Sequence, residues 1–388
     1  MLYCVLMKKN FIWFFLILFL SGVIIFIVFP KFFGGISYKK GDLNIVASVP
    51  EKEESKKKFL PVLPPLDKAA YDAKMEELAN NPLAVAPPAT ITTPPAGTPP
   101  PQGGEELPEP KNVSTPLWPV KTVYPNAGAI LPFKRVIAYY GNLYSRKMGV
   151  LGEYSEEEML AKLDVEIKKW EAADPSTPVL PALHYIAVVA QGSAGKDGKY
   201  RARMPDSEID KVIAMAEKIN AIVFLDIQVG FSTIEDELPR LEKYFKMPNV
   251  HLGMDPEFSM KSGIRPGKAV GTFDAADINF AASYLAKIAR ENNLTPKILV
   301  VHRYTGQMVT NSKQIKPLPE VQIVMHMDGW GGKEKKIGTY KLFIVPEPVQ
   351  FAGFKLFYKS DIKTPGTVLM TPADLLKLSP QPIYIQYQ

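Results

Sequence analysis

The feature that most constrains this chain is an alternation of apolar strands and amphipathic helices that begins near residue 130. Apolar strands separated by helices are typical of a parallel sheet that is covered on both faces. Eight strands spread over residues 130–388 match the usual size of a (β/α)8 barrel, so we predict an α/β, TIM-barrel-like domain there. The predicted strands are Arg135–Tyr140, Val179–Val189, Ala221–Gln228, Val250–Asp255, Lys297–His302, Val321–Asp328, Tyr340–Val345 and Phe351–Phe357.

Helix-start signals separate these strands. Ser155 is followed three residues later by Glu158, the spacing of a capping box, and predicts a helix over Ser155–Glu171. An open doubly wound sheet is the alternative, but no Gly-x-Gly-x-x-Gly follows the first strand, which disfavours a dinucleotide-binding version. The other predicted helices are Asp206–Asn220, Ile234–Phe245, Asp274–Asn293 and Pro372–Leu378.

The N-terminal part of the chain predicts a membrane anchor. The run Phe11–Phe29 carries no charge and, at about 1.5 Å per residue, is long enough to cross a hydrocarbon core of about 30 Å. It lacks a small-residue cleavage site, so we expect an uncleaved, single-pass signal anchor over residues 11–29. Lys8 and Lys9 favour a cytoplasmic segment over residues 1–10, although Lys31 lies on the other flank. We therefore expect a cell-membrane protein whose C-terminal domain is extracytoplasmic.

Residues 30–129 predict a disordered tether between anchor and barrel. The stretch 82–119 is rich in proline, which favours extended polyproline II over a packed core. Within the tether, residues 67–81 predict one short helix, with Asp67 as N-cap and Pro82 after its end, which we expect to fray or to rest weakly on the body.

Charge and cysteine content exclude several classes of function. The formal net charge of +6 is spread along the chain, and no stripe of Lys and Arg with interleaved aromatic residues appears, so we expect no nucleic-acid partner. The only cysteine is Cys4, which leaves the folded part without a disulfide or a thiolate metal site. Cys4 also precedes the apolar run, so it is not a lipoprotein anchor cysteine.

Two acids follow one of the predicted strands directly. In Val250–Phe258 (VHLGMDPEF), Asp255 and Glu257 share a face because side chains two apart on an extended chain point the same way. Pro256 cannot donate to a sheet ladder and marks the end of the strand. In a (β/α)8 barrel, the carboxyl ends of the strands carry the active site.

Polar side chains recur at the same end of other strands, so we expect them to converge on one mouth. Several carboxylates with aromatic rings suit sugar chemistry, in which one acid is protonated and another ionised. We predict Glu257 as proton donor with Asp255 or Asp328 as its partner and Asp226 as a further catalytic candidate. Tyr140, His184, Gln228, His302, Arg303, Tyr304, Trp330 and Tyr358 are the predicted substrate-binding residues.

Other chemistries find less support in the sequence. A metal hydrolase could use His184, His302, Asp226 and Asp255, but no His-x-His or His-Glu-x-x-His spacing is present, so we predict no metal and no cofactor. The loop Gly192–Gly198 lacks the Walker spacing. No Gly-x-Ser-x-Gly elbow indicates a serine hydrolase.

The chain resembles a family of uncharacterised bacterial membrane-anchored proteins and lipoproteins. The resemblance rests on Phe224–Gln228, Val250–Phe258, Val300–His302 and Met327–Gly329 and covers roughly Arg135 to Asp361. It implies an extracytoplasmic barrel behind a membrane anchor, although this chain lacks an anchor cysteine after its apolar run. More loosely, the Asp-x-Glu at a strand end is similar to barrel-fold glycoside hydrolases, including cell-wall muramidases.

Together these patterns predict a membrane-tethered, glycoside-hydrolase-like protein that acts on cell-envelope or extracellular polysaccharide. The alternative is a catalytically inactive barrel that binds glycan or another envelope component. A hydrolase of another type, with or without a metal, is a third hypothesis.

Overall fold

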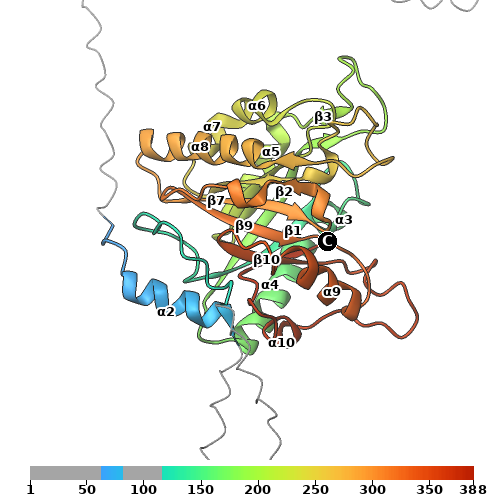
Figure 1. The fold of residues 1–388 in the computed structure, drawn as a ribbon. Helices are drawn as coiled ribbons and strands as arrows, with labels where there is room; N and C mark the ends of the chain where they lie inside the picture. Colours follow the sequence, from blue (N-terminus) through green and yellow to red (C-terminus); the bar gives the residue numbers. More distant parts are fainter. Residues whose placement is uncertain (1–62, 82–115) are drawn as a thin grey trace, which may run out of the picture. The chain divides into compact units, whose positions relative to one another are not determined.

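The computed structural model of the protein describes residues 63–81 and 116–388. Within them, eight parallel strands form a closed barrel (Figure 1). The last strand along the chain pairs with the first, and the first pairs with the second, so the ring has no open edge. The predicted (β/α)8 barrel is therefore confirmed, and the open sheet is excluded. In order around the ring the strands are β1 (Arg135–Gly141), β2 (Val179–Ala190), β4 (Ile222–Ile227), β5 (Val250–Met254), β7 (Lys297–Arg303), β9 (Val321–Met327), β10 (Phe351–Leu356) and β11 (Tyr384–Tyr387).

Helices surround the barrel, and the five predicted helical segments begin within one residue of the predicted position, whereas α3 (Val150–Glu153) and α9 (Lys333–Phe343) were not predicted. The Ser155 side chain accepts a hydrogen bond from Glu158 N at the start of one helix, and Asp274 and Asp277 form a reciprocal capping box at the start of another. In chain order the helices around the barrel are α3 (Val150–Glu153), α4 (Glu156–Ala173), α5 (Asp206–Glu217), α6 (Ile234–Glu237), α7 (Glu242–Phe245), α8 (Ala275–Glu291), α9 (Lys333–Phe343) and α10 (Pro372–Leu375). Shorter elements are β3 (Arg201–Arg203), β6 (Phe273–Asp274), β8 (Val309–Thr310) and the 3-10 turns η1 (Leu238–Leu241), η2 (Pro256–Phe258), η3 (Gly306–Met308) and η4 (Ser312–Gln314).

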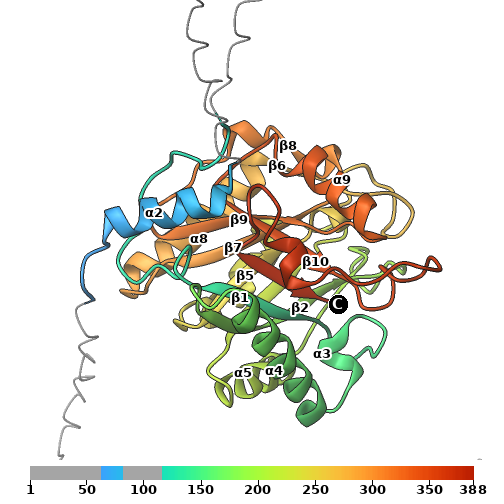
Figure 2. The same ribbon diagram turned by 90° about the horizontal axis from the view of Figure 1, so that it is seen from below.

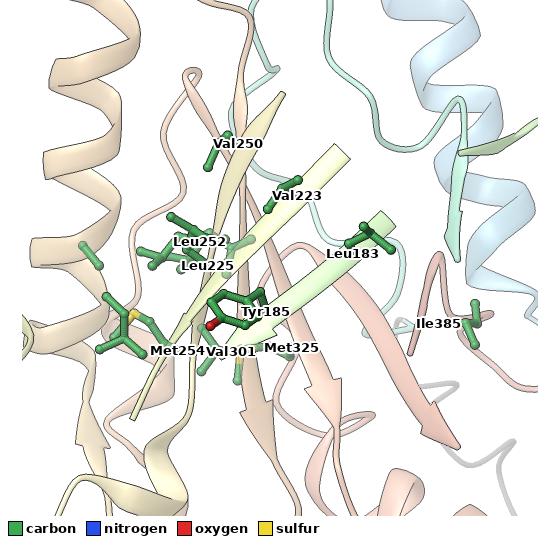
Figure 3. Packing of buried hydrophobic residues seen from close by; sticks show 14 of the residues in the cluster. Leu183, Tyr185, Val223, Leu225, Val250, Leu252, Met254, Val301, Met325 and Ile385 are labelled. Carbon is green, nitrogen blue, oxygen red and sulfur yellow. The ribbon is translucent and has the colours of Figure 1, made fainter. Parts of the chain in front are cut away.

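Alternate side chains of each strand face outward and form the layer between strands and helices. Figure 3 shows this packing for side chains of six strands. All of them are fully buried, as the two-residue period of a strand covered on its outer face requires. The labelled side chains are Leu183, Tyr185, Val223, Leu225, Val250, Leu252, Met254, Val301, Met325 and Ile385.

One predicted strand is wrong and one strand was missed. Tyr340–Val345 is not a strand: Tyr340 lies in the last turns of α9, with its ring buried against Phe354. The run Tyr-Lys-Leu-Phe-Ile-Val alternates as a strand does, but it continues the helix that begins at Lys333. The strand that completes the barrel is β11, whose four residues follow a proline-containing segment and offered too short a pattern to recognise.

The interior of the barrel is apolar near the amino ends of its strands. We call this set the lower interior, and none of its members is more than 7% exposed. It is one cluster with three side chains of the helix α2 (Lys68–Ala79), namely Tyr71, Met75 and Leu78. The lower interior consists of Val136, Ala138, Ala182, Ile222, Phe224, Ile298, Val300, Val324 and Phe351.

Helix α2 covers the lower interior rather than resting weakly on the body as we expected. Leu78 O accepts a hydrogen bond of 2.7 Å from Gln381 N, and Asn80 Nδ2 donates to Leu378 O at 2.9 Å. In Figures 1 and 2 the blue α2 and the C-terminal residue lie on different sides of the barrel. The compact unit that holds the barrel therefore includes residues on the N-terminal side of the predicted boundary at 130.

None of the helices within residues 63–81 and 116–388 is long and apolar enough to cross a membrane. The predicted anchor at Phe11–Phe29 and most of the predicted tether lie outside the described residues.

Candidate active site at the carboxyl end of the barrel

A cavity of about 310 Å³ opens at the carboxyl ends of the strands. Seven of the predicted site residues line it: Tyr140, Gln228, Asp255, Glu257, Tyr304, Asp328 and Trp330. Asp255 and Glu257 follow one strand, Asp328 and Trp330 follow another, and each of the other three residues comes from a strand end of its own. Lys147, Met148, Ile186, Ala190, Phe258, Lys355, Phe357 and Gln388 complete the lining.

The turn after β5 positions the two acids of the Asp-Pro-Glu segment. Pro256 begins the short 3-10 turn η2, and the Asp255 side chain accepts a hydrogen bond of 3.1 Å from Glu257 N. This contact caps the turn and fixes the direction in which Glu257 leaves it. Asp255 is buried while Glu257 is half-buried, so the second acid is the more accessible of the two.

Asp255 lies in an environment that favours its neutral form. Burial raises the pKa of this carboxyl well above its usual range, and the nearby carboxylates Asp226 and Glu257 raise it further. Its Oδ2 accepts a hydrogen bond of 3.0 Å from Gln228 Nε2, whose own Oε1 accepts from Ala190 N at 3.0 Å. The amide of Gln228 therefore holds Asp255 in place without supplying a charge.

Asp328 lies in the opposite environment. Burial alone would raise the pKa of its carboxyl, but Lys355 and His302 lower it below the usual range. Lys355 Nζ is 3.0 Å from Asp328 Oδ1, and His302 Nδ1 is 2.9 Å from Asp328 Oδ2. Lys355 and His302 together favour the ionised form of Asp328 within a buried setting.

Glu257 shares the cavity with Asp328 but forms no ion pair within the described residues. Burial raises the pKa of Glu257, and the negative charge of Asp328 adds to this effect. The cavity lining thus holds two carboxyl groups whose pKa values are shifted in opposite directions, upward for Glu257 and downward for Asp328. Tyr304 lies in the same lining, and Trp330, 54% exposed, stands at the rim.

Three further predicted residues lie beneath the floor of the cavity instead of lining it. His184, Asp226 and His302 have no exposed surface. Asp226 Oδ2 accepts a hydrogen bond of 2.9 Å from the hydroxyl of Tyr140, which does line the cavity. One ligand-type atom from each of the three residues lies within 4.8 Å of the others, so this trio is a group that could hold a metal ion.

Burial and mutual contact set the protonation of this trio in opposing directions. Burial lowers the pKa of His184 to about 4. Burial alone would raise the pKa of Asp226, but the adjacent histidines lower it instead. Burial alone would lower the pKa of His302, whereas Asp226 and Asp328 raise it.

Two predicted site residues, Arg303 and Tyr358, face away from the mouth. Arg303 follows the inward-facing His302 and so points outward, where its guanidinium pairs with Glu347 at 2.7 Å and binds loop carbonyls. Tyr358 lies on the outer side of the barrel, where its hydroxyl is 3.1 Å from that of Tyr139. Both assignments are corrected: the two-residue period of a strand places them on the wrong face.

Sequence reasoning missed several residues of the site and its floor. Lys355 sits at a predicted strand end but was not selected, because a lysine there does not by itself indicate chemistry. Tyr384 and Gln388 belong to or follow β11, which the sequence did not reveal. His326 faces inward at the end of β9, and its Nδ1 lies 3.3 Å from His302 Nδ1. The sequence feature that could have identified His326 is its position two residues before Asp328, which places both side chains on the same face of the strand.

Comparison with known proteins adds little to this geometry. No protein-family model matches the chain, and no curated protein matches it. Among solved structures, a sugar phosphate isomerase/epimerase from Parabacteroides distasonis aligns over 68% of this chain and 88% of its own, at 8% sequence identity and a TM-score of 0.29. A likeness this distant carries no argument about chemistry. Membership of a membrane-anchored family stays a prediction.

Proposed function

We propose that the barrel mouth performs acid–base chemistry on a carbohydrate, as a glycoside hydrolase does. The observation that supports this most is that Glu257 and Asp328 line one cavity in surroundings that shift their pKa values in opposite directions, upward for Glu257 and downward for Asp328. Hydrolysis of a glycosidic bond needs one carboxylic acid to protonate the leaving oxygen and one carboxylate to act on the other side of the sugar ring.

The surroundings favour Glu257 as the proton donor. It is the accessible acid, it has no cationic partner in the described residues, and the negative charge of Asp328 helps to keep it protonated. Asp328 is the better choice for the ionised partner, because Lys355 pairs with it at 3.0 Å whereas burial raises the pKa of Asp255 well above its usual range. Asp255 then serves to orient Glu257 through the turn contact at 3.1 Å.

The dimensions of the cavity bear on the substrate. A volume of about 310 Å³ lies at the lower end of the range of about 300–1,000 Å³ that small-molecule sites occupy. Such a space suits the end or a short segment of a glycan, with the exposed ring of Trp330 stacking on a sugar face at the rim. We propose polysaccharide of the cell envelope or outside the cell as the source, since the sequence predicts a single-pass anchor in the cell membrane.

The test uses full-length protein purified in mild detergent and incubated with a panel of envelope and extracellular glycans. We expect new reducing ends from the wild type, and a loss of at least about 100-fold in turnover for both Glu257→Gln and Asp328→Asn. Turnover should also fall as the pH rises through the raised pKa of Glu257, since the donor must be protonated. Glu235→Gln, an exposed carboxylate on α6, is the matched control and should leave turnover unchanged.

Two results would count against the proposal. If Glu257→Gln turned over glycan as the wild type does, the assignment of the proton donor would be wrong. If the wild type retained a glycan without cleaving it, the barrel would be a binding protein, and Trp330→Ala rather than Glu257→Gln should then abolish retention.

A further inference from the structure

Beneath the cavity floor, three buried polar atoms face one another without hydrogen-bond partners among the described residues. They are His184 Nε2, Asp226 Oδ1 and His302 Nε2. Leaving a buried polar atom unsatisfied costs about 1–3 kcal/mol, so three in one place require an explanation. The proposed glycoside chemistry uses none of these three atoms, although Asp328, one of its acids, contacts His302 at 2.9 Å.

The distances between these atoms are wrong for hydrogen bonds and right for shared ligation. His184 Nε2 lies 3.4 Å and His302 Nε2 lies 3.6 Å from Asp226 Oδ1. A charged histidine donating to a carboxylate would approach to about 2.7–2.9 Å. Two ligands of one tetrahedral ion, each about 2.1 Å from it, lie about 3.4 Å apart. We infer that His184, Asp226 and His302 bind one divalent first-row transition-metal ion through these three atoms.

The opposite side of each proposed ligand is held by a second residue, as metal ligands usually are. His302 Nδ1 lies 2.9 Å from Asp328 Oδ2, a carboxylate that fixes the proton on Nδ1 and leaves Nε2 free to coordinate. His184 Nδ1 lies 2.6 Å from the hydroxyl of Tyr384, whose oxygen can accept a hydrogen bond from Nδ1–H. Asp226 Oδ2 accepts from the Tyr140 hydroxyl at 2.9 Å, so only Oδ1 faces the histidines.

The strand β5 leaves space where the ion would lie. Gly253 faces the barrel interior between His184 and Asp226, and a Cβ at this position would come within 2.3 Å of His184 Nε2 and 2.5 Å of Asp226 Oδ1. Any other residue would therefore fill the gap between the ligand atoms. A glycine in the interior of a strand is unfavourable unless something approaches closely, and here the ligand atoms do.

Two histidines and one carboxylate are a donor set for zinc, and also for ferrous iron in sites with open positions. Tyr140 and Asp328, which contact the proposed ligands Asp226 and His302, also line the cavity above the ion. The ion would therefore hold the floor of the site in shape. The chemical class we assign is a borderline divalent cation, and Zn²⁺ is the probe.

The experiment measures metal directly, apart from any activity. Full-length protein in mild detergent is purified without chelator and its metal content determined by elemental analysis, then stripped by chelator and titrated with Zn²⁺. We expect about one ion per chain in the wild type. Asp226→Asn should weaken Zn²⁺ binding at least about 100-fold, since even outer-shell changes cost 10–100-fold. The matched control, Glu208→Gln, removes a buried carboxylate on helix α5 that pairs with Lys211, and it should bind Zn²⁺ as the wild type does.

A second variant guards against loss through misfolding. Gly253→Ala keeps all three ligands but fills the gap, so it should also lose the ion, with circular dichroism reporting whether the barrel is intact. Visible absorption of the Co²⁺-substituted wild type should show a low-symmetry site with nitrogen and oxygen ligands. Wild type that folds without metal and takes up no Zn²⁺ after stripping would overturn the inference: the trio would then be a hydrogen-bonded histidine–carboxylate cluster. Equal Zn²⁺ affinity in the wild type and in folded Asp226→Asn would overturn it as well.

Discussion

The two halves of the barrel interior are built from the same strands and differ completely in content. The lower interior is apolar, with Phe224 at its centre, and is covered by α2. The upper interior, two to four residues further along the same strands, holds Asp226, His302 and Asp328. One layer of side chains thus separates a mainly apolar region, in which the His251 ring packs beside Phe224, from a region that gathers acids and histidines.

This difference assigns separate tasks to the two halves. Apolar burial contributes stability roughly in proportion to the area removed from water, so the lower half stabilises the barrel. Burying charges and unsatisfied polar atoms reduces the stability of the folded state, so we attribute the polar content of the upper half to function. Residues in the lower half should therefore affect folding most strongly, and residues in the upper half should affect chemistry at little expense to folding.

The largest effect is expected at the centre of the lower half. Phe224→Ala should lower the free energy of unfolding by about 3–5 kcal/mol, because the ring is fully buried and the change leaves a cavity. Denaturant unfolding of the full-length protein measures it. The control Leu342→Ala, at a position 67% exposed, should change the value by less than about 0.5 kcal/mol. A loss below about 1 kcal/mol at Phe224 would remove the contrast between the halves.

A smaller effect is expected where α2 covers the lower half. Met75→Ala should destabilise the protein by about 2 kcal/mol, since Met75 is buried against the barrel from a helix at the edge of the core. Glu76→Ala, on the exposed side of the same helix, is the control. If both variants unfolded at the same denaturant concentration, α2 would contribute nothing to the lower half.

The smallest effect on stability is expected in the upper half. Here the wild type, and not the variant, should lose stability as the pH rises. Because the pKa of Asp255 is raised on folding, its contribution is complete below the ordinary carboxyl pKa and is lost as the pH rises towards the folded value. From pH 4 to pH 5, wild type should lose about 1 kcal/mol relative to Asp255→Asn, which has no such proton to release. Parallel stability curves for the two proteins over this range would contradict a raised pKa.

The fold was largely predictable because the strands of a parallel barrel are apolar on both faces. Seven strands, from Arg135 to Leu356, carried this pattern over enough residues to be recognised. The exceptions have physical causes. Helix α9 carries a run that alternates like a strand near its end, and β11 has only four residues after a proline-containing segment. Closure of the ring depends on pairing between β1 and β11, which no local pattern records.

The site was predictable to the extent that position along a strand decides direction. Asp255, Glu257 and Asp328 were found because acids at strand ends share one edge of the sheet. Arg303 and Tyr358 were misplaced because they were chosen for their chemistry, while their neighbours His302 and Phe357 already occupied the inward parity. The separation of His184 and Asp226 from the cavity depends on depth within the barrel, which the order of residues along the chain does not reveal.

The pairing of β11 with both β10 and β1 has a consequence for biosynthesis. β11 is the last of the eight strands to leave the ribosome, so until residue 387 emerges the nascent chain is an incomplete sheet with two exposed edges. Exposed edges invite pairing with other chains. A chain cut short between β10 and β11 should therefore be captured by holdase chaperones, whereas a chain that includes β11 should escape them.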